Sequence, residues 1–192
     1  MYLTIHASAR YTQIMMKALL FILSSITLII FSCSTEPEPQ DITGLWKSRD
    51  QHSDKPRALV AIYKYQDQYY GRMLATYDDE GKIKDTILEK KEKAPGVVGN
   101  PPYCGMDFIY NLIKEEDNRE TYDKYKGKIT NPEKGKVYNA ELWLSGDDLI
   151  VRGELWIFGK NIPWHKASKQ DLPKGFSMGD IKKFVPVIPI TY

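Results

Sequence analysis

Residues 137–158 read VYNAELWLSGDDLIVRGELWIF, and this stretch decides the fold class. Its first part alternates, so that one face of an extended chain carries Tyr138, Ala140, Leu142 and Leu144. The next four residues, SGDD, have the composition of a turn, and 149–158 (LIVRGELWIF) is again rich in β-branched and aromatic residues. Two such runs joined by a short polar turn predict an antiparallel β-hairpin.

Similar runs extend toward the N-terminus. The segments 59–65 (LVAIYKY) and 69–77 (YYGRMLATY) are separated by Gln-Asp-Gln and predict a second hairpin. In its second strand Arg72 and Thr76 lie opposite the apolar face, which predicts that this side is exposed to water. With 122–130, the turn NPEKGK at 131–136 and 162–166, about seven strands follow one another at spacings of roughly 8–12 residues. The pattern predicts an all-β antiparallel sandwich or barrel.

The middle of the chain interrupts this pattern. Residues 85–93 (DTILEKKEK) are charged and weakly helical, and 94–105 (APGVVGNPPYCG) is a connection rich in proline and glycine. Residues 107–113 (DFIYNLI) fit either a strand or a short helix. We therefore expect a short helical or irregular insertion within the β domain. The C-terminal residues 169–192 are expected to form a strap along that domain or a tail.

The N-terminal segment has the organisation of an export signal. Residues 18–31 are 14 uncharged residues preceded by Lys17, whereas the whole chain is 27% charged. A positive residue, an apolar stretch of this length and a small residue at the end are the parts of a secretory signal peptide. We expect a signal peptide at 1–32, with the true start at Met15 or Met16. An apolar strand or helix of the fold is the alternative.

A cysteine follows this segment directly. Ile30-Phe31-Ser32-Cys33 resembles the lipobox of bacterial lipoproteins, in which the cysteine carries the lipid, so Cys33 is the predicted lipid-attachment residue. Residues 33–41 are rich in proline and acidic residues and are expected to form a tether. This predicts a location in the cell envelope, anchored to a bacterial membrane by the N-terminal lipid and facing the periplasm or the exterior.

Removal of residues 1–32 would leave a neutral chain. That segment contains Arg10 and Lys17 and no acidic residue, so 25 of the 27 basic residues remain beside 25 acidic ones. This balance indicates no basic patch for nucleic acid, and the sequence contains no nucleic-acid-binding motif. With Cys33 lipidated, Cys104 would be the remaining thiol, and no internal disulfide is expected.

A set of short motifs resembles the DUF2147 family of bacterial exported proteins. The motifs are Gly44-Leu45-Trp46, Asn131-Pro132 with Gly135-Lys136 and Tyr138, Leu149, Val151-Arg152-Gly153, and Trp164. The resemblance runs from about residue 42 to residue 168, which we take as the β-barrel domain. It implies a small calycin-like β-barrel and no established activity. Members of the family often carry a cysteine pair in the middle of the domain, where this chain has Cys104 alone.

Trp46 and Arg152 are expected to have a structural role. A tryptophan on the first strand can close one end of a barrel, and an arginine from a late strand can lie over its ring, a cation–π contact of about 0.5–2 kcal/mol. A direct part in ligand binding is the alternative for this pair.

The sequence indicates no catalytic or metal-binding residue. Cys104 with His52 or His165 could in principle form a nucleophile and base, but its loop has no nucleophile motif, and a lone cysteine is more often a small buried apolar residue. The two histidines after the tether have no metal-ligand spacing. We therefore assign no catalytic residue, no metal and no cofactor.

Aromatic residues are the unusual feature of the predicted strands. They are Tyr63, Tyr65, Tyr69, Tyr70, Tyr77, Tyr138, Trp143, Trp156 and Trp164. They either fill the barrel or line a cavity for a small apolar or amphipathic ligand. We expect a non-catalytic cell-envelope lipoprotein whose barrel binds a small hydrophobic ligand or a protein partner. The alternative is an envelope enzyme with a site assembled from scattered residues. The oligomeric state stays open.

Overall fold

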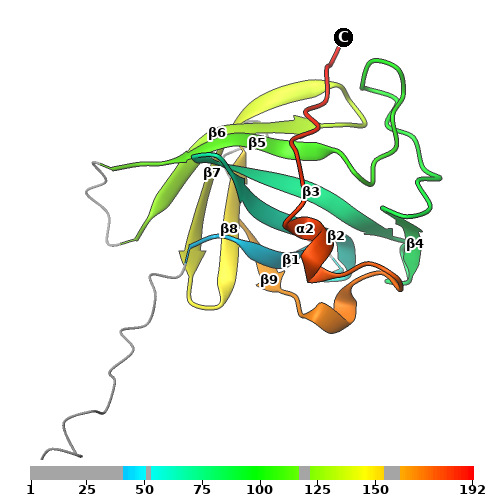
Figure 1. Cartoon of the computed structure of the whole chain (residues 1–192), viewed down its shortest axis with the longest axis horizontal. Coiled ribbons are helices and arrows are strands. Elements are labelled where there is room, and N and C mark those ends of the chain that lie inside the picture. Colours follow the sequence, from blue (N-terminus) through cyan, green and yellow to red (C-terminus); the bar gives the residue numbers. More distant parts are fainter. Residues whose placement is uncertain (1–40, 51–52, 117–121, 154–160) are drawn as a thin grey trace, which may run out of the picture. The chain divides into compact units, whose positions relative to one another are not determined.

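Nine antiparallel strands form one sheet in the described part of the chain, and eight of them close into a barrel (Figure 1). The computed structural model describes residues 41–50, 53–116, 122–153 and 161–192. Its strands are β1 (Gly44–Arg49), β2 (Pro56–Tyr65), β3 (Gln68–Tyr77), β4 (Ile83–Thr86), β5 (Asp107–Lys114), β6 (Lys124–Asn131), β7 (Lys136–Ser145), β8 (Asp148–Gly153) and β9 (Asn161–Lys166).

The barrel closes through the pairing of β2 with β3. The order around the sheet is β2-β1-β9-β8-β7-β6-β5-β3, and β4 pairs with β3 alone. Both predicted hairpins are confirmed, with turns at 66–67 and 146–147, and residues 154–158 of the last predicted strand lie outside the described residues. The all-β barrel class is confirmed too, with two more strands than the seven expected. The segment 107–113 is a strand rather than a helix, and a short strand lies at 83–86.

The weak helix expected at 85–93 is absent. Asp85 is fully buried, and its carboxylate accepts hydrogen bonds from the backbone N–H groups of Thr86 (2.8 Å) and Glu92 (2.9 Å). The backbone N–H of Ile87 donates to the carbonyl oxygen of Leu74 on β3 (2.8 Å). These bonds fold the segment back on the barrel as an irregular loop, because they use backbone donors that a helix would need for its own ladder.

The alternation in β7 sets which side chains enter the barrel. Tyr138, Ala140 and Leu142 are buried, as the pattern predicted, and the register places Leu142 between Tyr125 of β6 and Val151 of β8. Trp143 points the other way and is still buried. Its ring stacks on Tyr122, with the two ring centroids 5.6 Å apart. Ring contacts can therefore bury an aromatic side chain outside the barrel wall.

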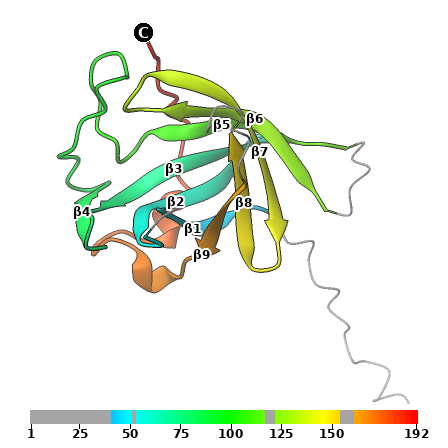
Figure 2. The same cartoon turned by 180° about the vertical axis from the view of Figure 1, so that it is seen from behind.

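The C-terminal segment covers the outer face of β2 and β3. It contains the short helices η1 (Lys169–Asp171) and α2 (Met178–Ile181) and then runs extended to the C-terminus, in red in Figure 1. Figure 2, seen from behind, shows β6 to β9 in front, with η1 close to β9 and the rest of this segment on the far side of the barrel. Arg72 is 6% exposed beneath it. The prediction that the face of β3 carrying Arg72 is exposed to water is therefore wrong.

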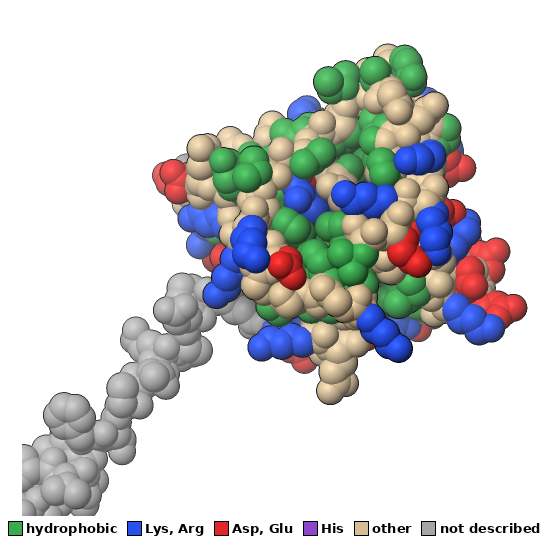
Figure 3. Space-filling model, turned by 45° about the vertical axis from the view of Figure 1, so that its right-hand side comes forward, with side chains coloured by type: hydrophobic (Ala, Val, Ile, Leu, Met, Phe, Trp, Pro, Cys, Tyr) green, Lys and Arg blue, Asp and Glu red, His purple; other side chains and the backbone are tan. Residues whose placement is uncertain are grey.

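This covering segment has apolar side chains of its own. Val185, Val187 and Ile190 are 59%, 54% and 72% exposed. Figure 3 shows hydrophobic side chains between basic and acidic ones on this side of the molecule. None of the helices in the described ranges is long and apolar enough to cross a membrane.

Candidate ligand-binding cavity

One end of the barrel opens into a cavity of about 700 Å³. Its mouth lies where β1, β3 and β8 end and where β2 and β9 begin, beside the β6–β7 turn. Apolar side chains from six strands line it, namely Ala58, Met73, Phe108, Ile129, Val151, Ile162 and Trp164. The hydroxyl groups of Ser48, Thr76 and Tyr138 add polar points to this lining. Strand alternation turns these side chains inward, so the cavity follows from barrel closure.

The opposite end of the barrel, called the packed end below, is occupied by buried side chains in the described part of the chain. Fully buried side chains from β1, β2, β5 and β6 fill it, among them Trp46, Ile62, Leu112 and Tyr125. The indole Nε1 of Trp46 donates a hydrogen bond to the carbonyl oxygen of Ile42 (3.0 Å), which holds the residues before β1 against this end. The expected closing role of Trp46 thus has a structural basis in burial and in this bond.

Arg152 does not take part in that closure. Its guanidinium is exposed on the outer face of β8 and lies 3.8 Å from the carboxylate of Glu141. Val151 faces the cavity, so the period of two along a strand turns Arg152 outward. The predicted cation–π contact between Arg152 and Trp46 is therefore wrong. The arginine that packs on aromatic rings is Arg72, 4.1 Å from the Phe184 ring centroid.

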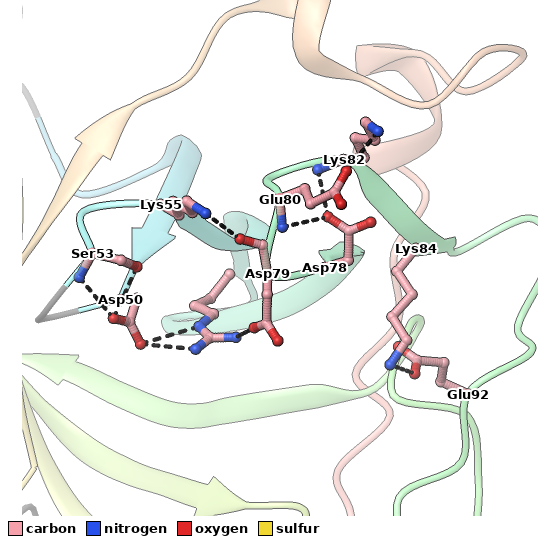
Figure 4. Close-up of polar contacts among 10 residues, drawn as sticks. Asp50, Ser53, Lys55, Asp78, Asp79, Glu80, Lys82, Lys84 and Glu92 are labelled. Carbon is pink, nitrogen blue, oxygen red and sulfur yellow. Dashed lines mark hydrogen bonds and ion pairs between the residues drawn. The ribbon is translucent and has the colours of Figure 1, made fainter.

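Ion pairs surround the mouth. The Arg57 guanidinium donates to the carboxylates of Asp50 (2.9 Å) and Asp79 (2.8 Å), and these two acids raise its pKa (Figure 4). On the other side Lys84 pairs with Glu92 at 2.5 Å, and the hydroxyl of Thr76 donates to the second oxygen of Glu92 (2.9 Å). The rim therefore presents charged groups that are already bound to one another.

The loop between β4 and β5 forms one wall of the mouth and contributes Glu92 and Tyr103. The N–H of Gly96 donates to the carbonyl oxygen of Pro132 in the β6–β7 turn (3.0 Å). Contact at this point is so close that a Cβ on Gly96 would lie 2.1 Å from the Gly135 nitrogen. The C-terminal segment holds the outer part of the loop, where Val98 donates to Ile190 (2.8 Å).

The thiol considered as a nucleophile is buried in this loop. Cys104 is 1% exposed, and burial, reinforced by the carboxylates of Asp85 and Glu92, raises its pKa from 9.0 to about 12. His165 lies on β9 with its Nδ1 2.7 Å from Asp148, and His52 lies outside the described residues. The structure thus places Cys104 among carboxylates, which disfavour a reactive thiolate.

The remaining predicted residues fall in different places. Of the aromatic side chains, Tyr77, Tyr138 and Trp164 line the cavity, whereas Tyr63 packs outside the barrel against Phe184. Trp156 and Cys33 lie outside the described residues. Within the described ranges, no three histidine, cysteine or acidic side chains gather as metal ligands would.

Sequence reasoning missed Met73 and Phe108 in the wall and Arg57 and Glu92 at the rim. The two wall residues belong to strands that the sequence predicted or allowed, so the sequence indicated that they are apolar strand residues. Their convergence depends on which strands pair across the closure between β2 and β3. The rim pairs join charges far apart in the sequence, and no local pattern marks them.

An eight-stranded antiparallel barrel with an apolar cavity at one end defines a calycin-like β-barrel fold. The sequence profile of the family described as "Uncharacterized protein conserved in bacteria (DUF2147)" matches residues 44–166. The chain therefore belongs to the DUF2147 family.

A solved structure supports the fold. It is described as "Protein HP1028 from the human pathogen Helicobacter pylori belongs to the lipocalin family" and is 19% identical to this chain, with a TM-score of 0.52. The likeness covers 74% of this chain and 97% of the other. Curated proteins provide no match. At this identity the likeness concerns the fold alone.

Proposed function

We propose that this protein is a non-catalytic binding protein that holds a small apolar or amphipathic molecule in the barrel. The observation that carries the proposal is the cavity of about 700 Å³ between Trp164 and the charged rim. Sites for small molecules are typically concave, about 300–1,000 Å³ in volume, apolar, and supplied with a few polar groups. A packed barrel of the same strand number would have no such space.

The chemistry of the lining supports binding. Phe108 and Trp164 face each other with ring centroids 6.2 Å apart, and both line the cavity. Such rings supply large apolar contact areas to a ligand. The hydroxyl groups of Ser48 and Tyr138 can orient a polar group without a charge.

The experiment is a fluorescence titration with N-phenyl-1-naphthylamine, an uncharged probe that brightens in apolar surroundings. We expect saturable binding by the wild-type protein. Ile162→Trp replaces an aliphatic side chain of the lining with a larger indole ring and should weaken binding of the probe at least tenfold. Arg152→Trp, on the outer face of the adjacent strand, is the matched control and should bind like the wild type. Equal affinities of the two variants would place the probe elsewhere and overturn the proposal.

We also propose that the protein is a lipoprotein of the cell envelope, anchored through Cys33. Asp41 lies near the packed end of the barrel, where its carboxylate is 3.3 Å from the Tyr69 hydroxyl. Since seven residues separate Cys33 from Asp41, a lipid on Cys33 would anchor the barrel through a short tether.

Detergent-phase partitioning of the full chain, produced in a host that processes lipoproteins, tests the anchor. Replacing Cys33 with Ser should move the protein to the aqueous phase. Cys104→Ser, the matched control, should stay in the detergent phase. Partitioning that persists without Cys33 would contradict the anchor.

A further inference from the structure

We infer that the ligand is uncharged in the part that enters the barrel, so that the cavity selects neutral ring or hydrocarbon compounds over organic anions such as carboxylates and sulfonates. This inference rests on the proposed binding function and names the ligand class of the same cavity. The shape of the barrel does not decide between these two ligand classes. An apolar cavity also accepts an organic anion when a free basic group lies at its mouth or in its depth.

Among the described residues, the depth of the cavity offers no partner for a charge. The charged residues of the described lining lie at strand ends, in β4 or in loops around the mouth, whereas the strand interiors contribute apolar side chains such as Met73, Phe108 and Trp164 and a few uncharged polar ones such as Thr130 and Tyr138. No Lys, Arg, His, Asp or Glu side chain of the described residues lines this inner part. A carboxylate or sulfonate carried there would lose its hydration without an ion partner, which strongly disfavours the charged form.

The rim does not compensate for that loss. Among the described lining residues it carries three basic side chains, Arg49, Arg57 and Lys84, and three acidic ones, Asp50, Glu92 and Glu133. Their charges sum to zero. Arg57 is held between Asp50 and Asp79, both labelled in Figure 4, and Arg49 donates to both the carbonyl oxygen (2.7 Å) and the carboxylate (2.9 Å) of Asp54.

Lys84 is occupied in the same way. Its ammonium pairs with Glu92, whose other oxygen accepts the Thr76 hydroxyl. An organic anion at the mouth would have to displace one of these carboxylates or reach the buried Nε of Arg49, which has no partner in the described residues, and in either case it would face the carboxylates as like charges. The rim therefore excludes an anion as much as it attracts one, and a neutral ligand enters without breaking any of these pairs.

Two probes with the same ring framework test the inference. N-Phenyl-1-naphthylamine is neutral, and 8-anilino-1-naphthalenesulfonate adds one sulfonate. We expect the wild-type protein to bind the neutral probe at least tenfold more tightly at low ionic strength. In competition, decan-1-ol should displace the neutral probe at lower concentration than decanoate does. A second pair with a different skeleton separates the effect of charge from the shape of one probe.

The outcomes separate the two proposals. Binding of the sulfonate as tight as that of the neutral probe, or displacement by decanoate at the lower concentration, would overturn this inference and leave the binding function standing. Failure of both probes and both competitors to bind would overturn the binding function itself, and the inference with it.

A rim variant gives an independent test. Glu92→Gln removes the carboxylate that neutralises Lys84 and leaves this ammonium at the mouth without its counter-charge. The preference for the neutral probe should then fall at least threefold, and raising the ionic strength should restore it because salt screens the new attraction. Glu115→Gln makes the same change of charge beside Lys126, away from the cavity, and should keep the wild-type preference. An unchanged preference in Glu92→Gln would show that the rim charges do not select the ligand.

Discussion

Arg72 on β3 and Asp107 on β5 form a buried ion pair, with the guanidinium Nε 3.0 Å from the carboxylate Oδ1, and the C-terminal segment is bound to both partners. The Arg72 guanidinium also donates to the carbonyl oxygen of Val185 (2.6 Å), and the N–H of Val187 donates to the Asp107 carboxylate. The Phe184 ring covers the guanidinium. This arrangement joins two barrel strands to a segment about 80 residues later in the chain.

Replacing Asp107 with Ala should lower the free energy of unfolding by about 3–5 kcal/mol, because it leaves Arg72 buried without a counter-charge. Urea denaturation followed by tryptophan fluorescence measures this. Glu80→Ala removes one partner of the exposed pair with Lys82 and should leave the unfolding midpoint nearly unchanged. If Asp107→Ala lowered the free energy of unfolding as little as Glu80→Ala does, the ion pair would not hold the C-terminal segment.

Replacing Trp46 with Ala should lower the free energy of unfolding by about 3–5 kcal/mol, since its ring is 1% exposed and its removal leaves a cavity at the packed end. Trp46→Phe keeps most of the packing, loses the bond to Ile42 and should cost less. Thermal unfolding followed by circular dichroism shows which of the two variants has the lower unfolding midpoint. Arg152→Ala, at an exposed position, is the control, and a loss equal to that of Trp46→Ala would restore the cation–π hypothesis.

Replacing Gly96 with Ala should destabilise the protein by about 1–3 kcal/mol, because the new Cβ would collide with backbone atoms of Gly135 that cannot move independently. The same variant should weaken binding of the neutral probe, since the loop of Gly96 forms part of the mouth. Gly99→Ala in the same loop meets no atom within 4 Å and bears only the strain of its positive φ. A larger loss for Gly99→Ala would contradict the importance of this contact.

Cys104 should make stability fall with rising pH above about 9. Its pKa is about 12 in the folded protein against 9.0 for the free group, so the unfolded chain loses the proton first between these values. The contribution of the buried, protonated thiol to the free energy of unfolding is complete below pH 9 and is lost as the pH rises toward 12. The slope of unfolding free energy against pH, measured from pH 8 to 10.5, should be less steep in Cys104→Ser.

Thiol labelling gives a second measurement. In a Cys33→Ser background, Cys104 should react with a disulfide reagent at pH 8 far more slowly in the folded protein than in urea. Equal rates would contradict both the burial and the raised pKa.

The hairpin of β7 and β8 shows what can be predicted from sequence. The alternation from Tyr138 to Leu144 assigned the inward face correctly, because the period of a strand depends only on local geometry. The polar turns predicted at 131–136 and 145–148 are also found, at 132–135 and 146–147. Local composition failed at 85–93, where the buried carboxylate of Asp85 binds the backbone of its own loop.

The sequence by itself determined the two hairpins, their turns and the all-β class, since each depends on residues close together in the chain. It left a sandwich open beside the barrel and a helix open beside the strand at 107–113. Only the tertiary structure decided that Arg72 is buried rather than wet, that Arg152 faces outward from Trp46, and that the barrel holds a cavity. Each of these depends on what lies across the barrel or over its outer face. The physical reason is that burial and charge pairing are properties of the closed barrel, in which partners such as Arg72 and Asp107 lie 35 positions apart in the chain.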